Sequence, residues 1–136
     1  NLARMIKENY GFVGAVEAPV QVTLRSDGRP GVYDVTEEVR SVCESVVPEI
    51  VEHLAAIFRG YDPEDQPEVL QNIILAGGGS RIRGLDVMLE KKLAEYGKAM
   101  VTCVDDPEYA GSIGALKMAQ EVAPEYWDQV GFVGSQ

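Results

Sequence analysis

Histidine and cysteine are scarce in this chain, which has one histidine and two cysteines among its 136 residues. The single histidine, His53, leaves almost no material for His-based catalytic triads or His-rich metal sites, and we expect it on a helix surface. Cys43 and Cys103 are too few and too far apart for a disulfide framework or a metal site. Each lies in an apolar stretch, so we expect both to pack in the core, and we assign no metal ligands.

Basic residues and long apolar runs are also lacking. Twelve basic side chains against twenty-two acidic ones give a net charge of −10, which repels nucleic acid and anionic lipid, so we expect neither as a partner. No apolar run approaches the roughly 18 to 20 residues needed to cross a bilayer. No signal peptide opens the chain either, and we expect a cytoplasmic protein without a transmembrane segment. Because the first residue is Asn1, within what reads as an amphipathic helix, we expect a piece of a longer protein.

What the chain does contain is enough apolar sequence, 46% of its residues, for one modest core. Hydrophobic periodicity and turn residues predict alternating helices and strands, and therefore an α/β core with helices on both faces of its strands. The expected elements are a helix over residues 2–11, a hairpin over 16–35 that turns at Ser26-Asp27-Gly28, a helix capped by Thr36 and broken or restarted at Pro48, a solvated connection over 61–68, a strand over 69–75, a helix over 85–93, a strand over 101–104, and a helix over 109–122 that ends at Pro124 to Trp127.

Three consecutive glycines follow the strand predicted before them, in the stretch Ile73 to Leu85, which reads IILAGGGSRIRGL. Glycines allow positive φ and let a flat or bulky group approach the main chain closely. Backbone amides at the start of the next helix also favour a polar or anionic ligand. The alternative is a tight connection without a ligand. In the last predicted helix, Gly111, Gly114 and Ala115 are small enough for a neighbouring element to approach closely.

The order of elements, the run GGGSRIRGL and the later run VTCVDDPEYAGSIGALKMA together resemble the actin/Hsp70-like ATPase superfamily. The runs IKENYGFVG, DVTEEVRSVCESVVPEIVEHL and PEYWDQVG are most similar to the MreB-like bacterial actins, and among these to the magnetosome-associated filament proteins. The resemblance implies an α/β C-terminal lobe. Residues 1–35 would then be part of the small subdomain above the cleft, and residues 36–136 the large subdomain with the adenosine-binding glycine loop.

The resemblance also implies an ATP site. The loop residues that it places near adenine are Gly77, Gly78, Gly79, Ser80, Arg81 and Ile82. A family pattern, R-x-I-K-E, matches Arg4 to Glu8 and implies that Lys7 and Glu8 reach the adenine and ribose. A carboxylate can accept two hydrogen bonds from a ribose diol, and a lysine stem can cover a base. Without the resemblance, Lys7 and Glu8 read as an ordinary solvated helix face. Arg81, where actins have an aromatic residue or methionine, is a candidate to stack on the adenine.

The phosphate-binding loops of the family, with the acids that hold Mg²⁺ and the group that orients water, have no counterpart in this segment. We therefore expect no catalytic residue here, an inactive segment on its own, and Mg²⁺ held mainly by residues outside it. For the complete protein the resemblance implies an ATPase that assembles head to tail into filaments. These would lie alongside magnetosome membranes and organise the vesicles into a chain, with magnetosome-associated adaptor proteins as partners. The region Glu17 to Val35 is then a candidate assembly surface, or else an ordinary sheet edge.

Two other functions stay open. A nucleotide-independent scaffold or partner-binding domain would keep the actin fold without turnover. A chaperone-type ATPase or a sugar kinase of the same superfamily would need a downstream substrate domain or a sugar site, and the sequence shows neither.

Overall fold

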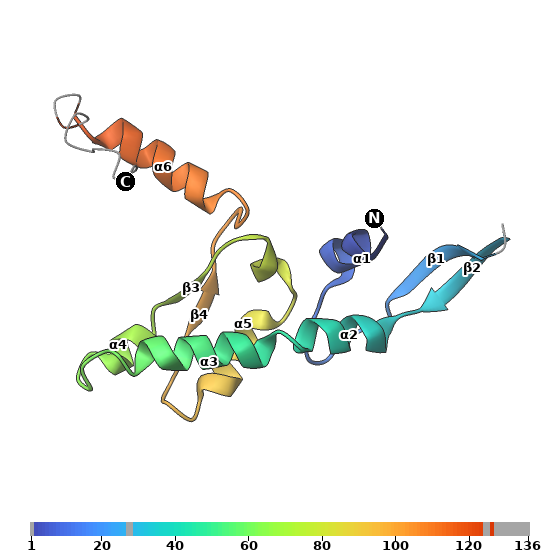
Figure 1. Cartoon of the computed structure of the whole chain (residues 1–136), viewed down its shortest axis with the longest axis horizontal. Helices are drawn as coiled ribbons and strands as arrows, with labels where there is room; N and C mark the ends of the chain where they lie inside the picture. The colour runs from blue at the N-terminus through green and yellow to red at the C-terminus, as the bar shows by residue number, and fades with distance from the viewer. Residues whose placement is uncertain (1, 27–28, 124–125, 127–136) are drawn as a thin grey trace, which may run out of the picture.

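The computed structural model describes residues 2–26, 29–123 and 126 (Figure 1). Its strands form two separate two-stranded sheets rather than one. The elements in these residues are α1 (Leu2–Tyr10), β1 (Gln21–Ser26), β2 (Arg29–Asp34), α2 (Thr36–Glu44), α3 (Val47–Phe58), α4 (Gln66–Leu70), β3 (Ile73–Leu75), the 3₁₀ helix η1 (Gly78–Arg81), α5 (Leu85–Leu93), β4 (Val101–Cys103) and α6 (Ala110–Glu121).

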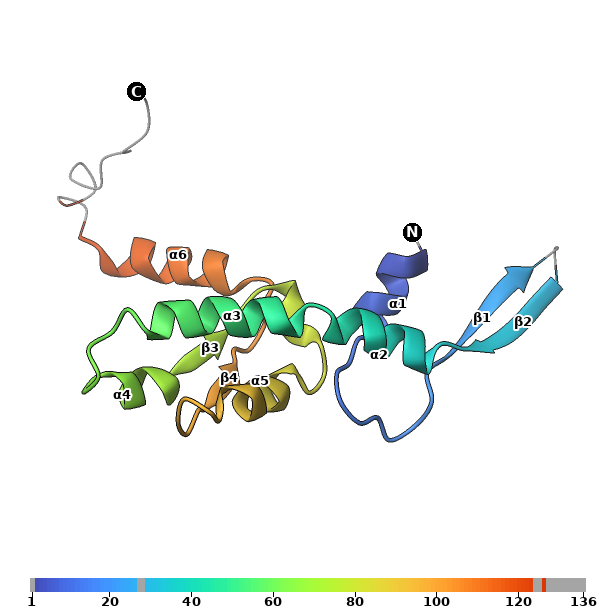
Figure 2. The same ribbon diagram turned by 60° about the horizontal axis from the view of Figure 1, so that its bottom comes forward.

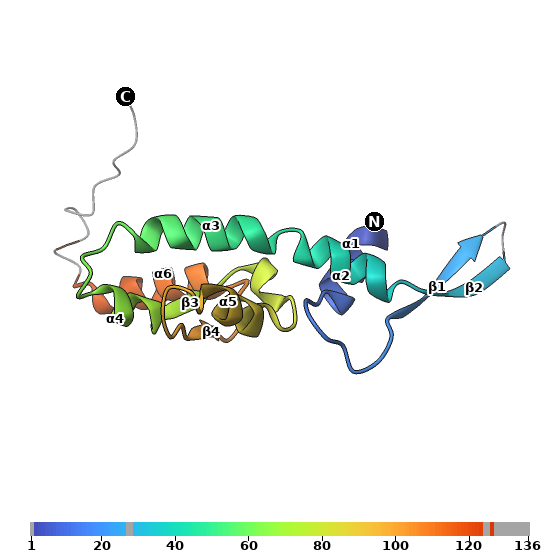
Figure 3. The ribbon, with the colours of Figure 1, turned by 90° about the horizontal axis from the view of Figure 1, so that it is seen from below.

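The parallel pair β3 and β4 forms the centre of the molecule, with Ile73 opposite Val101 and Leu75 opposite Cys103. Helix α5 connects the two strands and packs against β4 and α3, and α3 runs alongside this layer (Figure 3). The buried cluster joins this unit to the chain after α1 and to α2; it contains Phe12, Val13, Val20, Val39, Cys43, Val47, Leu85, Leu89 and Val101.

Only one face of this small sheet is covered in the described part of the chain. Ile74 points away from the core and is 67% exposed, while its neighbours Ile73 and Leu75 pack against the buried cluster. The prediction that helices cover both faces of the strands is therefore not met among these residues. The period of two along a strand explains the difference, because an apolar run places alternate side chains on opposite faces whether or not both are covered.

The predicted hairpin is confirmed as the antiparallel pair β1 and β2, which projects from the N-terminal end of α2 (Figure 2). Its predicted turn residues Asp27 and Gly28 lie outside the described residues. The predicted cap at Thr36 is wrong: Val35 is the N-cap of α2, and its side chain makes no capping hydrogen bond.

Thr36 instead joins the base of the hairpin to the helix. Its hydroxyl donates to the Asp34 carboxylate at 2.6 Å and accepts the backbone N–H of Val20 at 2.7 Å. Asp34 also accepts the backbone N–H of Thr36 at 3.0 Å. The two hydrogen bonds that Asp34 accepts from Thr36 hold the pKa of Asp34 below its ordinary value of 3.8. The bond from the Thr36 hydroxyl has the larger effect, and the bond from the backbone N–H the smaller one.

Proline positions explain where two helices begin. Pro48 lies in the first turn of α3, where a missing N–H costs nothing, so the predicted restart at Pro48 is confirmed. Pro67 occupies the equivalent place in α4. The strand predicted from Val69 therefore begins only at Ile73, because Val69 and Leu70 belong to α4.

Helix α6 follows β4 as predicted, but it lies apart from the rest of the described chain (Figure 1). None of its twelve residues, all of them described, is buried. A Cβ atom at Gly111 or Gly114 would meet no other described atom within 4 Å, so the predicted close neighbour is absent from this part of the chain. The predicted end of the helix at Pro124 to Trp127 falls largely outside the described residues.

Candidate functional site

A short backbone bridge joins the two segments that were predicted to bind a nucleotide. The N–H of Val13, just after α1, donates to the carbonyl of Arg83 at 2.9 Å, and the N–H of Arg83 donates to the carbonyl of Gly11 at 3.1 Å. Phe12 and Arg83 thereby form an isolated parallel bridge. Since α1 ends before this bridge and the glycine loop ends at it, the bridge fixes the two segments relative to each other.

Glycine is required at this junction. A Cβ at Gly11 would lie 2.6 Å from the carbonyl oxygen of Lys7, so no side chain fits as the chain leaves α1. Gly84 has a φ of +77°, and a Cβ there would lie 3.0 Å from the carbonyl oxygen of Val13. A left-handed conformation with backbone this close strongly favours glycine.

The glycine loop leaves β3 through Gly77, which has a φ of +84°, and forms η1 before α5 begins. The N–H of Gly77 donates to the carbonyl of Pro107, beyond β4, at 2.7 Å. The Ser80 hydroxyl donates to the carbonyl of Gly77, also at 2.7 Å. Gly77 and Ser80 therefore shape the loop through hydrogen bonds within the protein.

The loop and α1 together line a cavity of about 480 Å³, within the range of small-molecule sites. Six of the eight predicted site residues line it: Lys7, Glu8, Gly78, Gly79, Arg81 and Ile82. The other two, Gly77 and Ser80, are not among the lining residues. The remaining wall is formed by Arg4, Asn9 and Glu108.

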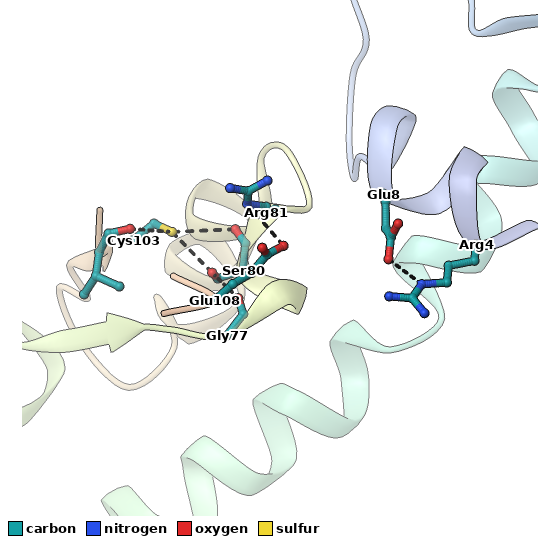
Figure 4. A network of polar contacts seen from close by, with 8 residues as sticks. Arg4, Glu8, Gly77, Ser80, Arg81, Cys103 and Glu108 are labelled. Carbon is teal, nitrogen blue, oxygen red and sulfur yellow. Dashed lines mark hydrogen bonds and ion pairs between the residues drawn. The ribbon is translucent and has the colours of Figure 1, made fainter. Parts of the chain in front are cut away.

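Two ion pairs occupy the walls of this cavity (Figure 4). On α1, the Arg4 Nε donates to a Glu8 carboxylate oxygen at 2.7 Å. This hydrogen bond lowers the pKa of Glu8 and raises that of Arg4. On the opposite wall, the Arg81 Nε lies 3.6 Å from the Glu108 carboxylate.

The lining side chains carry a small positive excess, although the whole chain has a net charge of −10. Arg4, Lys7 and Arg81 are basic, whereas Glu8 and Glu108 are acidic. Lys7 has no ion pair among the described residues. Such a cavity suits a ligand with both hydrogen-bond donors and negative charge.

Sequence reasoning missed the three remaining lining residues. Arg4 was part of the pattern that selected Lys7 and Glu8, and Asn9 follows them on the same helix, where its side chain donates to the carbonyl of Met5 at 2.8 Å. One feature of the sequence could have placed Glu108 near the glycine loop. It follows β4, and the carboxyl ends of neighbouring parallel strands lie at the same edge of a sheet.

The expectation for the two cysteines is half right. Cys43 is buried, but Cys103 is exposed, with its sulfur 3.4 Å from the Ser80 hydroxyl oxygen. Cys103 lies on the same strand face as buried Val101, but it is the last residue of β4, where the strand passes into the following loop. His53 is exposed on α3, as predicted.

Other possible sites offer less chemistry. A second cavity of about 480 Å³ lies between α3 and α5 and is lined largely by apolar side chains, including Val47, Val51, Ala55 and Met88. Within residues 2–26, 29–123 and 126, no three acidic, histidine or cysteine side chains come together as a metal site. In the same ranges, no helix has the length and apolarity of a membrane span.

Comparison with known proteins agrees with the expected family. The family model described as MreB/Mbl protein matches residues 5–125. The actin-like protein MamK of Magnetospirillum gryphiswaldense is 46% identical over 136 residues, all of this chain and 38% of the relative. The chain thus spans well under half the length of the curated relatives that it matches.

Solved structures show the same likeness. A non-polymerising MamK mutant bound to AMPPNP is 45% identical and superposes with a TM-score of 0.83, over 89% of this chain and 37% of that one. A MamK double helical filament is also 45% identical, with a TM-score of 0.86 over 90% of this chain and 38% of that one. The chain has the α/β fold of these proteins and belongs to the MreB/Mbl family of actin-like proteins.

Proposed function

We propose that this chain is the adenosine-binding part of an actin-like ATPase that polymerises with ATP. The observation that carries the proposal is the convergence of Lys7 and Glu8 from α1 with Gly78, Gly79 and Arg81 from the glycine loop on one cavity. These segments are far apart in the sequence. The AMPPNP carried by the MamK structure is an ATP analogue with an imido group in place of the β–γ bridging oxygen, so it supports the same ligand class.

Each wall has a defined part in the proposed site. The Glu8 carboxylate accepts hydrogen bonds from the ribose diol. Lys7 covers the base with its stem and keeps its ammonium in water. Gly78 and Gly79 let the ligand approach the main chain closely, because neither has a side chain to fill the cavity.

Catalysis requires residues beyond this segment. ATP supplies the phosphoryl group, and the Mg²⁺ that accompanies it needs acidic ligands that this cavity does not group together. Glu8 and Glu108 are each paired with an arginine. We assign Mg²⁺ mainly to residues outside the segment, which by itself binds adenosine weakly and does not hydrolyse ATP.

The domain assignment belongs to this proposal as well. We assign residues 1–35 to the small subdomain above the cleft and residues 36–136 to the large subdomain of the C-terminal lobe. ATP binding would favour head-to-tail stacking, a heterologous contact that generates open filaments. The filament formed by MamK supports this step. By the same relationship, we propose a cytoplasmic filament that organises magnetosome vesicles through adaptor proteins, with the hairpin as a contact surface.

Sedimentation of the full-length protein with ATP, ADP or no nucleotide tests the proposal. We expect the wild type to pellet only with ATP, and Lys7→Ala and Gly78→Leu to remain in the supernatant at the same ATP concentration. Gly78 has space for a Cβ, 3.8 Å from Glu108, but a leucine would extend into the cavity. Lys91→Ala is the matched control, because Lys91 is exposed on α5 and does not line this cavity.

The outcomes separate ATP-dependent assembly from a scaffold role. Pelleting of the wild type without nucleotide would favour a nucleotide-independent scaffold. The candidate site residues would then have only a structural role. A wild type that never pellets would refute filament formation itself.

A further inference from the structure

Glu108 is a charged residue that lines the cavity but has no role in the nucleotide site as proposed so far. It lies in the loop between β4 and α6, after Pro107, and faces the glycine loop rather than solvent alone (Figure 4). A Cβ at Gly78 would lie 3.8 Å from the Glu108 carboxylate, so this side chain stands directly beside the part of the loop that lines the cavity.

The backbone fixes where Glu108 stands. The carbonyl of the preceding residue, buried Pro107, accepts the N–H of Gly77 at 2.7 Å. Asp106 adopts a φ of +46°, and its carbonyl accepts the N–H of Tyr109, which closes a turn around Glu108. The loop after β4 is therefore anchored to the loop after β3, and Glu108 is held against the glycine loop by backbone bonds.

The Glu108 carboxylate makes its ion pair with Arg81, whose Nε lies 3.6 Å away. Both side chains line the cavity and about half of each is exposed. A guanidinium on a flexible stem has many rotamers, and it loses less freedom on binding when a neighbour already restricts its plane. An acid at this position restricts the one cavity arginine that belongs to the glycine loop.

We propose that Glu108 is a positioning residue that orients the Arg81 guanidinium against the base of the bound nucleotide. This inference rests on the proposed function, because it assigns a base to the cavity. Glu108 acts through Arg81 and makes no contact with the phosphates. The opposite effect, repulsion between the carboxylate and the nucleotide phosphates, predicts tighter ATP binding when Glu108 is removed, so the sign of the change distinguishes the two.

Equilibrium binding of ATP and of adenosine to the full-length protein tests this role. Adenosine has the base and ribose but no phosphate, so an effect through the base appears with both ligands. We expect Glu108→Ala to weaken both by about fivefold, a typical coupling for neighbouring groups. Glu108→Gln keeps an oxygen that can accept the Arg81 Nε–H and should recover part of the affinity.

Two further variants complete the design. In an Arg81→Ala background, Glu108→Ala should cause no additional loss, since its target is gone. Asp105→Asn is the charge control, because Asp105 lies in the same loop and does not line the cavity. It should leave both affinities unchanged.

Three results would overturn the inference while leaving ATP binding intact: unchanged affinities in Glu108→Ala, tighter binding of ATP alone, or additive losses in the double variant. A wild type that binds neither ATP nor adenosine would instead overturn the proposed function and this inference with it.

Discussion

The two walls of the cavity are built in different ways. The glycine loop is held by the backbone hydrogen bond from Gly77 to Pro107, in the loop after β4, and leads into α5, whose Leu85 and Leu89 are buried. Helix α1, by contrast, has no buried residue among its nine, all of which are described. It joins the fold at the bridge between Phe12 and Arg83, and its ion pair is exposed.

The difference shows which property each wall contributes. Substitutions in the loop wall act on conformation and packing, because the backbone there is fixed by hydrogen bonds and leads directly into buried Leu85. Substitutions of the exposed residues of α1 act on ligand chemistry, since Ile6 is the residue of this helix that packs against the buried cluster.

Leu89→Ala should destabilise the protein by about 2–5 kcal/mol, since it leaves a cavity at a fully buried position behind the glycine loop. Met5→Ala, on α1 with a side chain 46% exposed, should change stability by no more than about 0.5 kcal/mol. Urea unfolding of the full-length protein measures both. Similar costs for the two variants would show that α1 is as well packed as α5 and would remove the contrast.

Within the loop wall, Gly77→Ala should cost about 1–2 kcal/mol, because alanine is strained at its φ of +84° even though nothing described lies within 4 Å of the new Cβ. Gly79→Ala should be nearly neutral for stability, because Gly79 has neither a positive φ nor a close neighbour among the described atoms. The same unfolding experiment compares them. Equal destabilisation would show that the positive φ of Gly77 is not what requires glycine there.

On the α1 wall, Lys7→Ala should weaken ATP binding by about tenfold, the loss expected when roughly two methylenes of the stem no longer cover the base, and leave the unfolding midpoint unchanged. Calorimetry gives the affinity, with Lys91→Ala as the control. A lower midpoint together with the weaker binding would assign Lys7 to the fold rather than to the ligand.

The smallest effect concerns the ion pair on α1. Arg4→Ala should raise the pKa of Glu8 towards its ordinary value of 4.5, since it removes the hydrogen bond that lowers it. The pair stabilises the fold above pH 4.5, and this contribution is lost as the pH falls through the lower pKa of the folded state. Because both groups are exposed, we expect a change in the NMR titration of Glu8 without a measurable change in stability. If the pKa of Glu8 does not change in Arg4→Ala, a group other than Arg4 lowers it.

Local sequence signals predicted the elements well where one physical rule dominates. Pro48 starts α3, and the spacing of Leu85, Leu89 and Leu93 gives the buried face of α5. Errors arose where two rules compete. Thr36 has the chemistry of a cap, but Asp34 and Val20 take its hydroxyl. Val69 has the preference of a strand residue, but Pro67 begins a helix before it.

The site was predicted less from local patterns than from resemblance. Isolated Lys7 and Glu8 on an exposed helix carry no local sign of a ligand, and the pattern that selected them came from the family. Glu108 was missed because its closeness to Gly78 arises from the parallel pairing of β3 with β4, which brings two distant loops together. Cys103 was misplaced because an apolar setting in the sequence does not show that β4 ends at this residue, where burial is lost.

The bridge between Phe12 and Arg83 also orders events during synthesis. Helix α1 is synthesised before the other described elements, and everything from the hairpin to the glycine loop must follow before Arg83 can pair with Phe12. Such long-range closure is slow compared with helix formation. The cavity proposed to bind nucleotide is therefore incomplete at least until Arg83 has emerged and paired, and a nucleotide bound there would selectively stabilise chains that have finished this step.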